Sequence, residues 1–266
     1  MYDDPAPRAS RALFLHCSGG NGRQWQPITA PLAGRIDCVA PELIGYGEGD
    51  AWRCGAALSL DDEVDRIAAH LYAHVEGVHL VGHSYGAAIA LQAALRHPHQ
   101  VRSLTLYEPV RFALLFGSPA TVTAAREVIA LGREVERLAL AGELTASAER
   151  FVDYWSGAGA WAQMKPSRQQ ALAARMPKIG AEFDALFCDG TPAHAYRRLA
   201  MPVRLLAGER SPQPVRLIAL RLAARLPNAE LIAMPGLGHM GPLTHPQAVA
   251  DKLPAWLAPS APALAA

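Results

Sequence analysis

One serine in this sequence has the surroundings that a nucleophile requires. The segment Gly82-His83-Ser84-Tyr85-Gly86 places a glycine two residues before and two residues after Ser84. A serine on a sharp turn from a strand into a helix has a crowded backbone, so small neighbours are needed on both sides. Such a turn exposes the hydroxyl at the start of the helix, where developing negative charge is favoured. The pattern predicts nucleophilic chemistry at Ser84.

The segments on either side of Ser84 fit this turn. Residues 78–81 form a short apolar run typical of a buried strand, and residues 85–96 are rich in small residues at helical spacing. A chance Gly-x-Ser-x-Gly match would not require a strand before it and a helix after it. The context therefore favours a functional turn.

The remainder of the chain alternates strand-like and helical segments. This alternation predicts an α/β fold with a mostly parallel central sheet flanked by helices. The expected strands cover residues 12–16, 37–40, 78–81, 103–107, 203–207 and 230–234. The expected helices outside the middle of the chain cover residues 60–74, 85–96, 214–226 and 246–257.

A long stretch in the middle of the chain contains helical periodicity and no convincing strand. We therefore expect a core domain made of residues 1–117 and 197–266, and an inserted helical cap subdomain of residues 118–196. The longest helix of the insertion is expected at residues 121–140. The later helices are expected to be interrupted at Gly157, Gly159, Pro166, Pro177 and Gly190.

With these features the chain resembles the α/β-hydrolase family over roughly residues 11 to 258. The resemblance implies a loop for oxyanion binding after the first strand, a nucleophile turn, a helical cap between two core strands, and a histidine after the last strand. It also implies the chain order nucleophile, acid, histidine. Because few residues precede Ala12, the sheet should lack the antiparallel hairpin with which the family often begins.

The expected general base is His239. It follows the last predicted strand in Gly236-Leu237-Gly238-His239-Met240-Gly241, where the glycines allow a loop to turn the imidazole toward the serine. His245 precedes Pro246 and is typical of a helix entry. His16 and His83 are expected to shape the pocket rather than to transfer protons.

The resemblance places the oxyanion hole in two backbone N–H groups. Tyr85, the residue after the nucleophile, supplies one, and Ser18 in the loop after the first strand supplies the other. The family usually has His-Gly at the start of this loop, whereas this chain has His16 followed by Cys17. We interpret Cys17 as structural, since no base accompanies it.

The acid of the triad has more than one candidate. Many family members carry an aspartate where this chain has Ser211, and a serine cannot stabilise an imidazolium as a carboxylate does. Other members place the acid after the preceding strand, where this chain has Glu108 at the carboxyl end of residues 103–107. We prefer Glu108, with Glu209 as the alternative acid and a site without a working acid as a third possibility.

Other residues of the predicted cleft have weaker indications. Arg111 could bind a substrate carboxylate, although a paired or solvated arginine is the more ordinary interpretation. A pocket between core and cap could be lined by large side chains, which by default would simply be core; these are Trp25, Tyr46, Trp155, Trp161, Met164 and Phe183.

Composition limits the range of functions. The 266 residues are 51% hydrophobic and 18% charged, which indicates a globular protein, and the net charge of +1 without a basic run argues against nucleic-acid binding. No stretch reaches the ~20 apolar residues of a membrane span. The acidic N-terminal Met-Tyr-Asp-Asp-Pro does not resemble a secretory signal, so we expect a cytoplasmic location. Nothing indicates an oligomeric state.

The four cysteines, Cys17, Cys38, Cys54 and Cys188, have no metal-binding spacing and are expected to be reduced thiols. We expect neither a metal nor an organic cofactor.

The leading hypothesis is a serine hydrolase that acts on a small carboxylic ester, thioester, lactone or related carbonyl substrate through an acyl-enzyme. One alternative is a hydrolase-fold protein that binds a small ligand or partner with little or no turnover. Another is a C–C bond hydrolase or perhydrolase using the same serine. A haloalkane dehalogenase is disfavoured, because that resemblance would require an aspartate at position 84.

Overall fold

The computed structural model describes residues 10–47, 52–53, 55–254 and 257. Within them lies a six-stranded sheet in the order β2-β1-β3-β4-β5-β6, and every described pairing of neighbouring strands is parallel. The α/β fold with a mostly parallel sheet is therefore confirmed. The strands are β1 (Arg11–Leu15), β2 (Asp37–Val39), β3 (Val78–His83), β4 (Val101–Tyr107), β5 (Val203–Gly208) and β6 (Ala229–Met234).

The first strands show why two core layers form. Successive side chains of a strand point to opposite faces, so Leu13 and Leu15 of β1 belong to one apolar cluster, whereas Ala12 and Phe14 belong to the other. All four side chains are fully buried. A strand with both faces apolar needs a cover on each side, and helices provide it.

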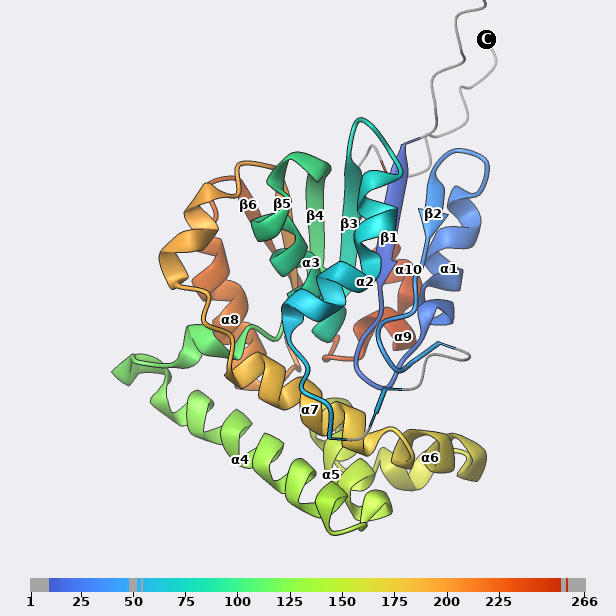
Figure 1. The fold of residues 1–266 in the computed structure, drawn as a ribbon, viewed down its shortest axis with the longest axis vertical. Coiled ribbons are helices and arrows are strands. Elements are labelled where there is room, and N and C mark those ends of the chain that lie inside the picture. Colours follow the sequence, from blue (N-terminus) through green and yellow to red (C-terminus); the bar gives the residue numbers. More distant parts are fainter. Residues whose placement is uncertain (1–9, 48–51, 54, 255–256, 258–266) are drawn as a thin grey trace, which may run out of the picture.

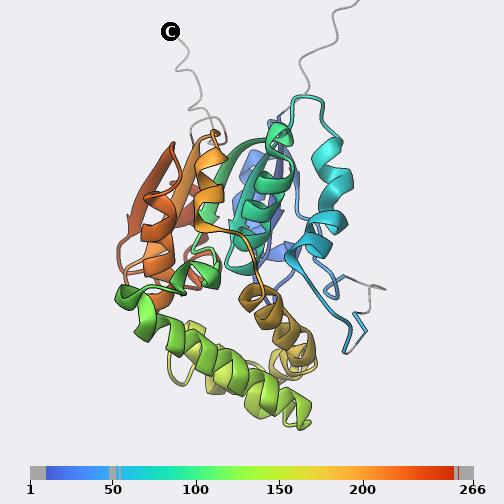
Figure 2. The same cartoon turned by 60° about the vertical axis from the view of Figure 1, so that its left-hand side comes forward.

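Helices cover both faces of the sheet. One face is covered by α2 (Leu60–Tyr72), α3 (Tyr85–Arg96) and α8 (Gln213–Ala223), which contribute to one apolar cluster, and Figures 1 and 2 show α3 between the other two. The other face carries α1 (Gln26–Thr29) and α10 (Pro246–Ala250), with the short α9 (Gly241–Thr244) nearby. The helix expected at residues 246–257 is shorter than predicted, because the chain turns at residues 251–253 before Pro254.

The start of α2 illustrates how local sequence fixes a boundary. The Ser59 hydroxyl accepts the backbone N–H of Asp62, and the Asp62 carboxylate accepts the backbone N–H of Ser59 at 2.8 Å. This reciprocal pair satisfies two backbone donors at the helix start. The predicted helix accordingly begins at the expected residue, although it ends at Tyr72, two residues early.

Between β4 and β5 the described chain is helical. The main helices are α4 (Val122–Leu140), α5 (Leu144–Ser156), α6 (Pro166–Ala173) and α7 (Met176–Phe187). Figure 1 shows them together below the sheet, beyond the ends of its strands. The helices are interrupted directly before two of the predicted prolines: Pro166 begins α6, and Pro177 lies in the first turn of α7. Proline is tolerated there because the first backbone N–H groups of a helix have no partner within it.

Some predictions fall on residues that the structure does not describe, and others can be compared with it. No antiparallel strand pairs with the sheet among the residues that the structure describes. The acidic N-terminal residues and Cys54 lie outside the described ranges, so the expectations made for them are untested. In the described ranges, no helix combines the length and apolar character needed to cross a bilayer.

Candidate active site

Ser84 lies on a strained turn between β3 and α3. Its backbone has φ 57° and ψ −113°, a region that residues with a side chain rarely adopt. The turn needs its two glycines: a Cβ on Gly82 would lie 2.6 Å from the Cα of Ala87, and one on Gly86 would lie 2.5 Å from the carbonyl oxygen of His16. The structure thus gives a physical reason for the Gly-x-Ser-x-Gly spacing.

His239 lies within hydrogen-bond distance of this serine. Its Nε2 is 2.9 Å from the Ser84 Oγ. Both side chains are almost completely buried. The ring of Trp155, from α5, lies over the imidazole with 4.3 Å between the ring centres. This contact restricts the rotation of the imidazole and excludes solvent from one of its faces.

Glu108 lies on the other side of the same imidazole. Its Oε2 is 2.6 Å from Nδ1 of His239, and its Oε1 accepts the backbone N–H of Gly208 at 2.6 Å. The carboxylate is fully buried, and the residue has the unusual φ of 47° directly after β4. A buried carboxylate in this position can orient the Nδ1–H tautomer and leave Nε2 free to accept a proton.

The alternative acid points elsewhere. Glu209 is exposed, and its Oε2 accepts the backbone N–H of Gly236 at 3.2 Å. Ser211, at the usual position of the acid, is buried, and its hydroxyl has no hydrogen-bond partner among the described residues. Of the two carboxylates proposed from sequence, the structure brings only Glu108 to His239.

The loop that carries His239 is held by two side chains from neighbouring strands. His83 Nε2 donates to the His239 carbonyl oxygen at 2.8 Å, and the Tyr107 hydroxyl donates to the Gly238 carbonyl oxygen at 2.7 Å. Burial, and then the nearby His239, lower the pKa of His83 well below its ordinary value. A neutral His83 that donates to the loop fits its expected role in shaping the pocket.

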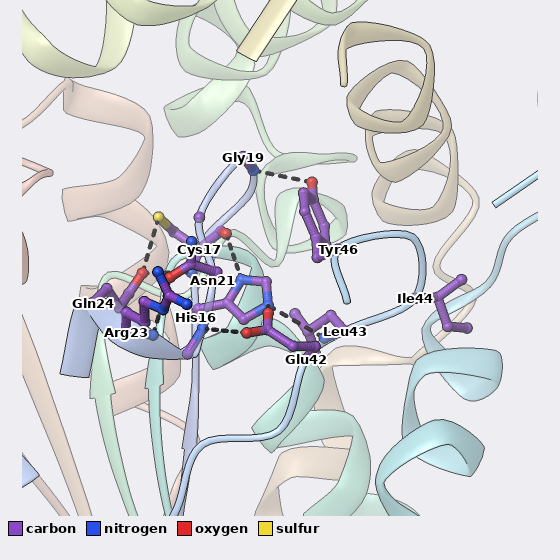
Figure 3. Close-up of polar contacts among 12 residues, drawn as sticks. His16, Cys17, Gly19, Asn21, Arg23, Gln24, Glu42, Leu43, Ile44 and Tyr46 are labelled. Carbon is purple, nitrogen blue, oxygen red and sulfur yellow. Dashed lines mark hydrogen bonds and ion pairs between the residues drawn. The ribbon is translucent and has the colours of Figure 1, made fainter. Parts of the chain in front are cut away.

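The loop after β1 brings Ser18 to the same place. Ser18 and Ser84 line one cavity, and Tyr85 follows Ser84 as the first residue of α3, where backbone N–H groups lack helical partners. Gln24 fastens the loop, since its Oε1 accepts the Cys17 backbone N–H at 3.1 Å and lies 3.3 Å from the Cys17 sulfur (Figure 3). Cys17, which stands where the family usually has a glycine, is therefore held in place by a hydrogen bond to Gln24.

Cys17 itself is not a competing nucleophile. Burial, and then the charge of Glu182, raise the pKa of its thiol to about 12. The thiol stays protonated at neutral pH, and only the thiolate is strongly nucleophilic.

A cavity of about 520 Å³ opens next to Ser84 and His239. Trp155 and Met164 line it, as the sequence suggested, and Phe183 lines a narrow extension of about 20 Å³ that also reaches Ser84. Trp25 packs against Phe14 in the core instead, with 5.6 Å between ring centres. Trp161 is also a core residue.

Arg111 is a structural residue. It is fully buried, and its guanidinium forms an ion pair with Asp189 at 2.7 Å and donates to the Tyr196 hydroxyl at 2.9 Å. With these partners it connects the end of β4 to the chain that follows α7. The structure therefore gives no support to a substrate-binding role for Arg111.

Sequence reasoning missed a buried ionic cluster behind the loop after β1. Lys178 of α7 lies 2.8 Å from Glu63 of α2 and 2.7 Å from Glu182. The hydroxyl of Tyr46 donates to Glu182 at 2.6 Å. It also accepts the backbone N–H of Gly19 at 3.0 Å, a contact that Figure 3 shows. The cluster thus connects the helical segment to the residue next to Ser18.

Replacing Lys178 by methionine should destabilise the protein strongly. Burial lowers the pKa of Lys178, but Glu182 and then Glu63 outweigh that effect and raise the pKa, so the ammonium is charged at neutral pH. Its removal leaves two buried carboxylates without a cation, which should cost about 3–5 kcal/mol of unfolding free energy. Urea unfolding measures the loss.

The matched control for this variant is Arg102→Met. Arg102 forms an exposed ion pair with Glu76 at 3.0 Å, and removing such a pair should cost about 0–1 kcal/mol. Equal losses for the two variants would contradict a structural role for the buried cluster.

Among the described residues, no group of three or more His, Cys, Asp and Glu side chains is arranged to hold a metal ion. The hydrogen bonds of His239 to Ser84 and Glu108 define a candidate site of one serine, one histidine and one glutamate.

The chain matches a known family along most of its length. Residues 12–252 match the model of the alpha/beta hydrolase family, and the chain belongs to this family. The resemblance inferred from the sequence is therefore confirmed.

Individual relatives are more distant. The chain is 36% identical over 101 residues to lipase LipV of Mycobacterium tuberculosis, an alignment that covers 38% of this chain and 37% of the relative. The chain thus spans little more than a third of the length of this curated relative.

Two solved structures share the fold. The alpha/beta hydrolase MGS-M2, from a Medee basin deep-sea metagenome library, has a TM-score of 0.74 at 16% identity, covering 92% of this chain and 87% of that one. Carboxylesterase CesB of Bacillus subtilis has a TM-score of 0.67 at 20% identity, and the match covers 92% of this chain and 82% of CesB.

Proposed function

We propose that this protein is a serine hydrolase that cleaves a small carboxylic ester, thioester, lactone or related carbonyl compound through an acyl-enzyme. The observation that carries the proposal is the unbroken series Ser84, His239 and Glu108, with 2.9 Å from Oγ to Nε2 and 2.6 Å from Nδ1 to the carboxylate. A lipase and a carboxylesterase among the similar proteins agree with it.

In the proposed mechanism, the Ser84 hydroxyl attacks the carbonyl carbon while Nε2 of His239 takes its proton. Glu108 stabilises the imidazolium that forms and fixes its orientation. The backbone N–H groups of Ser18 and Tyr85 stabilise the negative oxygen of the tetrahedral intermediate. His239 then returns the proton to the leaving alcohol or thiol, and water hydrolyses the acyl-enzyme by the same steps.

Residues 118–196 act in this proposal as a cap, and residues 1–117 and 197–266 as the core that holds the catalytic groups. Support comes from the cavity wall, because α5 contributes Phe151 and Trp155 to it and α6 contributes Leu172. A cap in this position decides which substrates reach Ser84. The substrate is a small molecule, and the catalytic steps require no metal or organic cofactor.

A binding protein without turnover is less well supported. Cys17 and Ser211 favour that hypothesis, because they stand where the family usually has a glycine and an aspartate. Cys17 has its own anchor in Gln24, and Glu108 occupies the position facing His239 that the missing aspartate would otherwise fill. A binding role would leave the buried serine, histidine and carboxylate without a purpose.

Fluorophosphonate labelling tests the function without knowledge of the substrate. The reagent should modify Ser84 in the wild-type protein, because His239 activates its hydroxyl. The protein should also hydrolyse short p-nitrophenyl esters, because the cavity of about 520 Å³ next to Ser84 and His239 admits a small ester. Mass spectrometry locates the label, and absorbance follows hydrolysis. Neither labelling nor hydrolysis in folded protein would contradict the proposal.

A further inference from the structure

Three arginines line the cavity that contains Ser84 and His239. Arg23 lies in η1 (Gly22–Trp25), shortly after the loop that follows β1, Arg168 lies in α6, and Arg175 directly precedes α7. Among the described residues, no aspartate or glutamate lines this cavity. The charges of the whole chain nearly cancel, to a net +1. The lining of this cavity, with three arginines and no carboxylate among its described residues, is therefore much more positive than the protein as a whole.

None of these three arginines forms an ion pair among the described residues, and two of them are exposed. The exposed two are Arg23 and Arg168. Arg175 differs, because its Nη1 donates to the carbonyl oxygens of Gly19 and Gly20 at 2.9 and 3.2 Å. Arg175 therefore also holds the loop next to Ser18, and its cation adds to the field of the other two.

The charge of Arg168 reaches the loop beside Ser84. Burial and Glu182 raise the pKa of Cys17, and Arg168 acts in the opposite direction. Arg175 lies over the ring of Tyr46, with 5.4 Å from the guanidinium carbon to the ring centre. These two cations and Arg23 therefore lie on the side of the cavity formed by the loop after β1 and by α6.

The remaining walls are not suited to an anion. Much of the rest of the main cavity is apolar, with Phe151, Trp155 and Leu243 among its lining residues. The narrow extension is lined by Glu182, whose Oε2 is buried without a hydrogen-bond partner among the described residues. An anionic group is repelled there and attracted to the arginines of the main cavity.

We propose that the substrate is a small ester or related carbonyl compound that carries an anionic group, a carboxylate or a phosphate, away from the reacting carbonyl. This inference rests on the proposed hydrolase function and names its substrate class. Guanidinium groups bind carboxylate and phosphate oxygens in a fixed fork geometry. Arg23 and Arg168 hold the anion while the carbonyl faces Ser84, and their field draws anionic substrates into the cavity.

Matched substrate pairs test the inference on the wild-type protein. The carboxylate arm compares mono-p-nitrophenyl glutarate with its neutral methyl ester. The phosphate arm compares 4-(butanoyloxy)phenyl phosphate with its neutral dimethyl ester. We expect kcat/KM to be at least about tenfold higher for the anionic member of one pair, and the ratio to fall with added salt because exposed charges are screened. The arm that shows the preference identifies the anion.

Variants connect the preference to the arginines. Arg23→Gln and Arg168→Gln should each lower the ratio of anionic to neutral kcat/KM several-fold, and the double variant should remove most of it. Arg133→Gln is the matched control, because Arg133 is exposed on α4 and does not line the cavity. The control should keep the wild-type ratio.

The possible failures are distinguishable. Fluorophosphonate labelling and hydrolysis of the neutral esters, without any anionic preference, would overturn the substrate class and leave the hydrolase function standing. A preference that persists in the double variant would overturn the assignment to Arg23 and Arg168. Absence of both labelling and hydrolysis would overturn the hydrolase function and this inference with it.

Discussion

Ser84→Ala should lower kcat for short p-nitrophenyl esters by about 10⁴–10⁶-fold. The variant keeps the binding cavity and the oxyanion donors but has no atom that can form the acyl-enzyme, so only residual catalysis remains. Fluorophosphonate labelling should disappear with it. Steady-state kinetics with circular dichroism on the same sample separate loss of chemistry from loss of fold.

Two further variants make this experiment sharper. Ser167→Ala is the matched control, since Ser167 is exposed on α6, and it should keep wild-type activity. Ser84→Ala combined with His239→Ala should lose little more than either single variant, because the two side chains act as one unit at 2.9 Å. Losses that multiply would show independent roles, and wild-type turnover by Ser84→Ala would exclude the mechanism.

Glu108→Gln should lower kcat by about 10²–10⁴-fold at nearly unchanged shape. The side-chain oxygen of the new residue can still accept the Gly208 N–H, which turns its NH₂ group toward Nδ1 of His239. Because an NH₂ group donates, it favours the tautomer with its proton on Nε2, the nitrogen that must accept the Ser84 proton. The charge that stabilises the imidazolium is lost as well.

Glu209→Gln is the control for this variant, because Glu209 is exposed and its carboxylate accepts only the Gly236 N–H among the described residues. It should change kcat by less than about twofold. Adding Ser211→Asp to the Glu108→Gln variant should recover part of the rate, since the family resemblance implies that both positions can reach the same histidine. An unchanged kcat in Glu108→Gln would refute the assignment of the acid.

Features that depend on residues close together in the chain could be predicted from the sequence. The turn at Ser84 needs Gly82 and Gly86 because its backbone leaves no room for a Cβ, and such a requirement is visible in five consecutive letters. The capping pair Ser59 and Asp62 is equally local. Alternation and helical spacing likewise predicted all six strands to within two residues, because burial of one or both faces imposes these periods.

The choice between the two candidate acids could not be made without the three-dimensional fold. Glu108 and Glu209 both follow strands that end at the same edge of the sheet, so topology alone brings each near His239. The direction of each side chain depends on its own backbone. Glu108 has a φ of 47° and a carboxylate fixed by Gly208, whereas the Glu209 carboxylate bonds Gly236.

The charges around the cavity were also beyond the reach of sequence analysis. Lys178 meets Glu63 across 115 positions of the chain, and Arg168 and Arg23 reach one cavity from separate elements. No local pattern encodes such a meeting, because an ionic interaction depends on distance in space and on burial. The packing of the helical segment against the loop after β1 sets both, and it thereby determines the charge of the proposed substrate site.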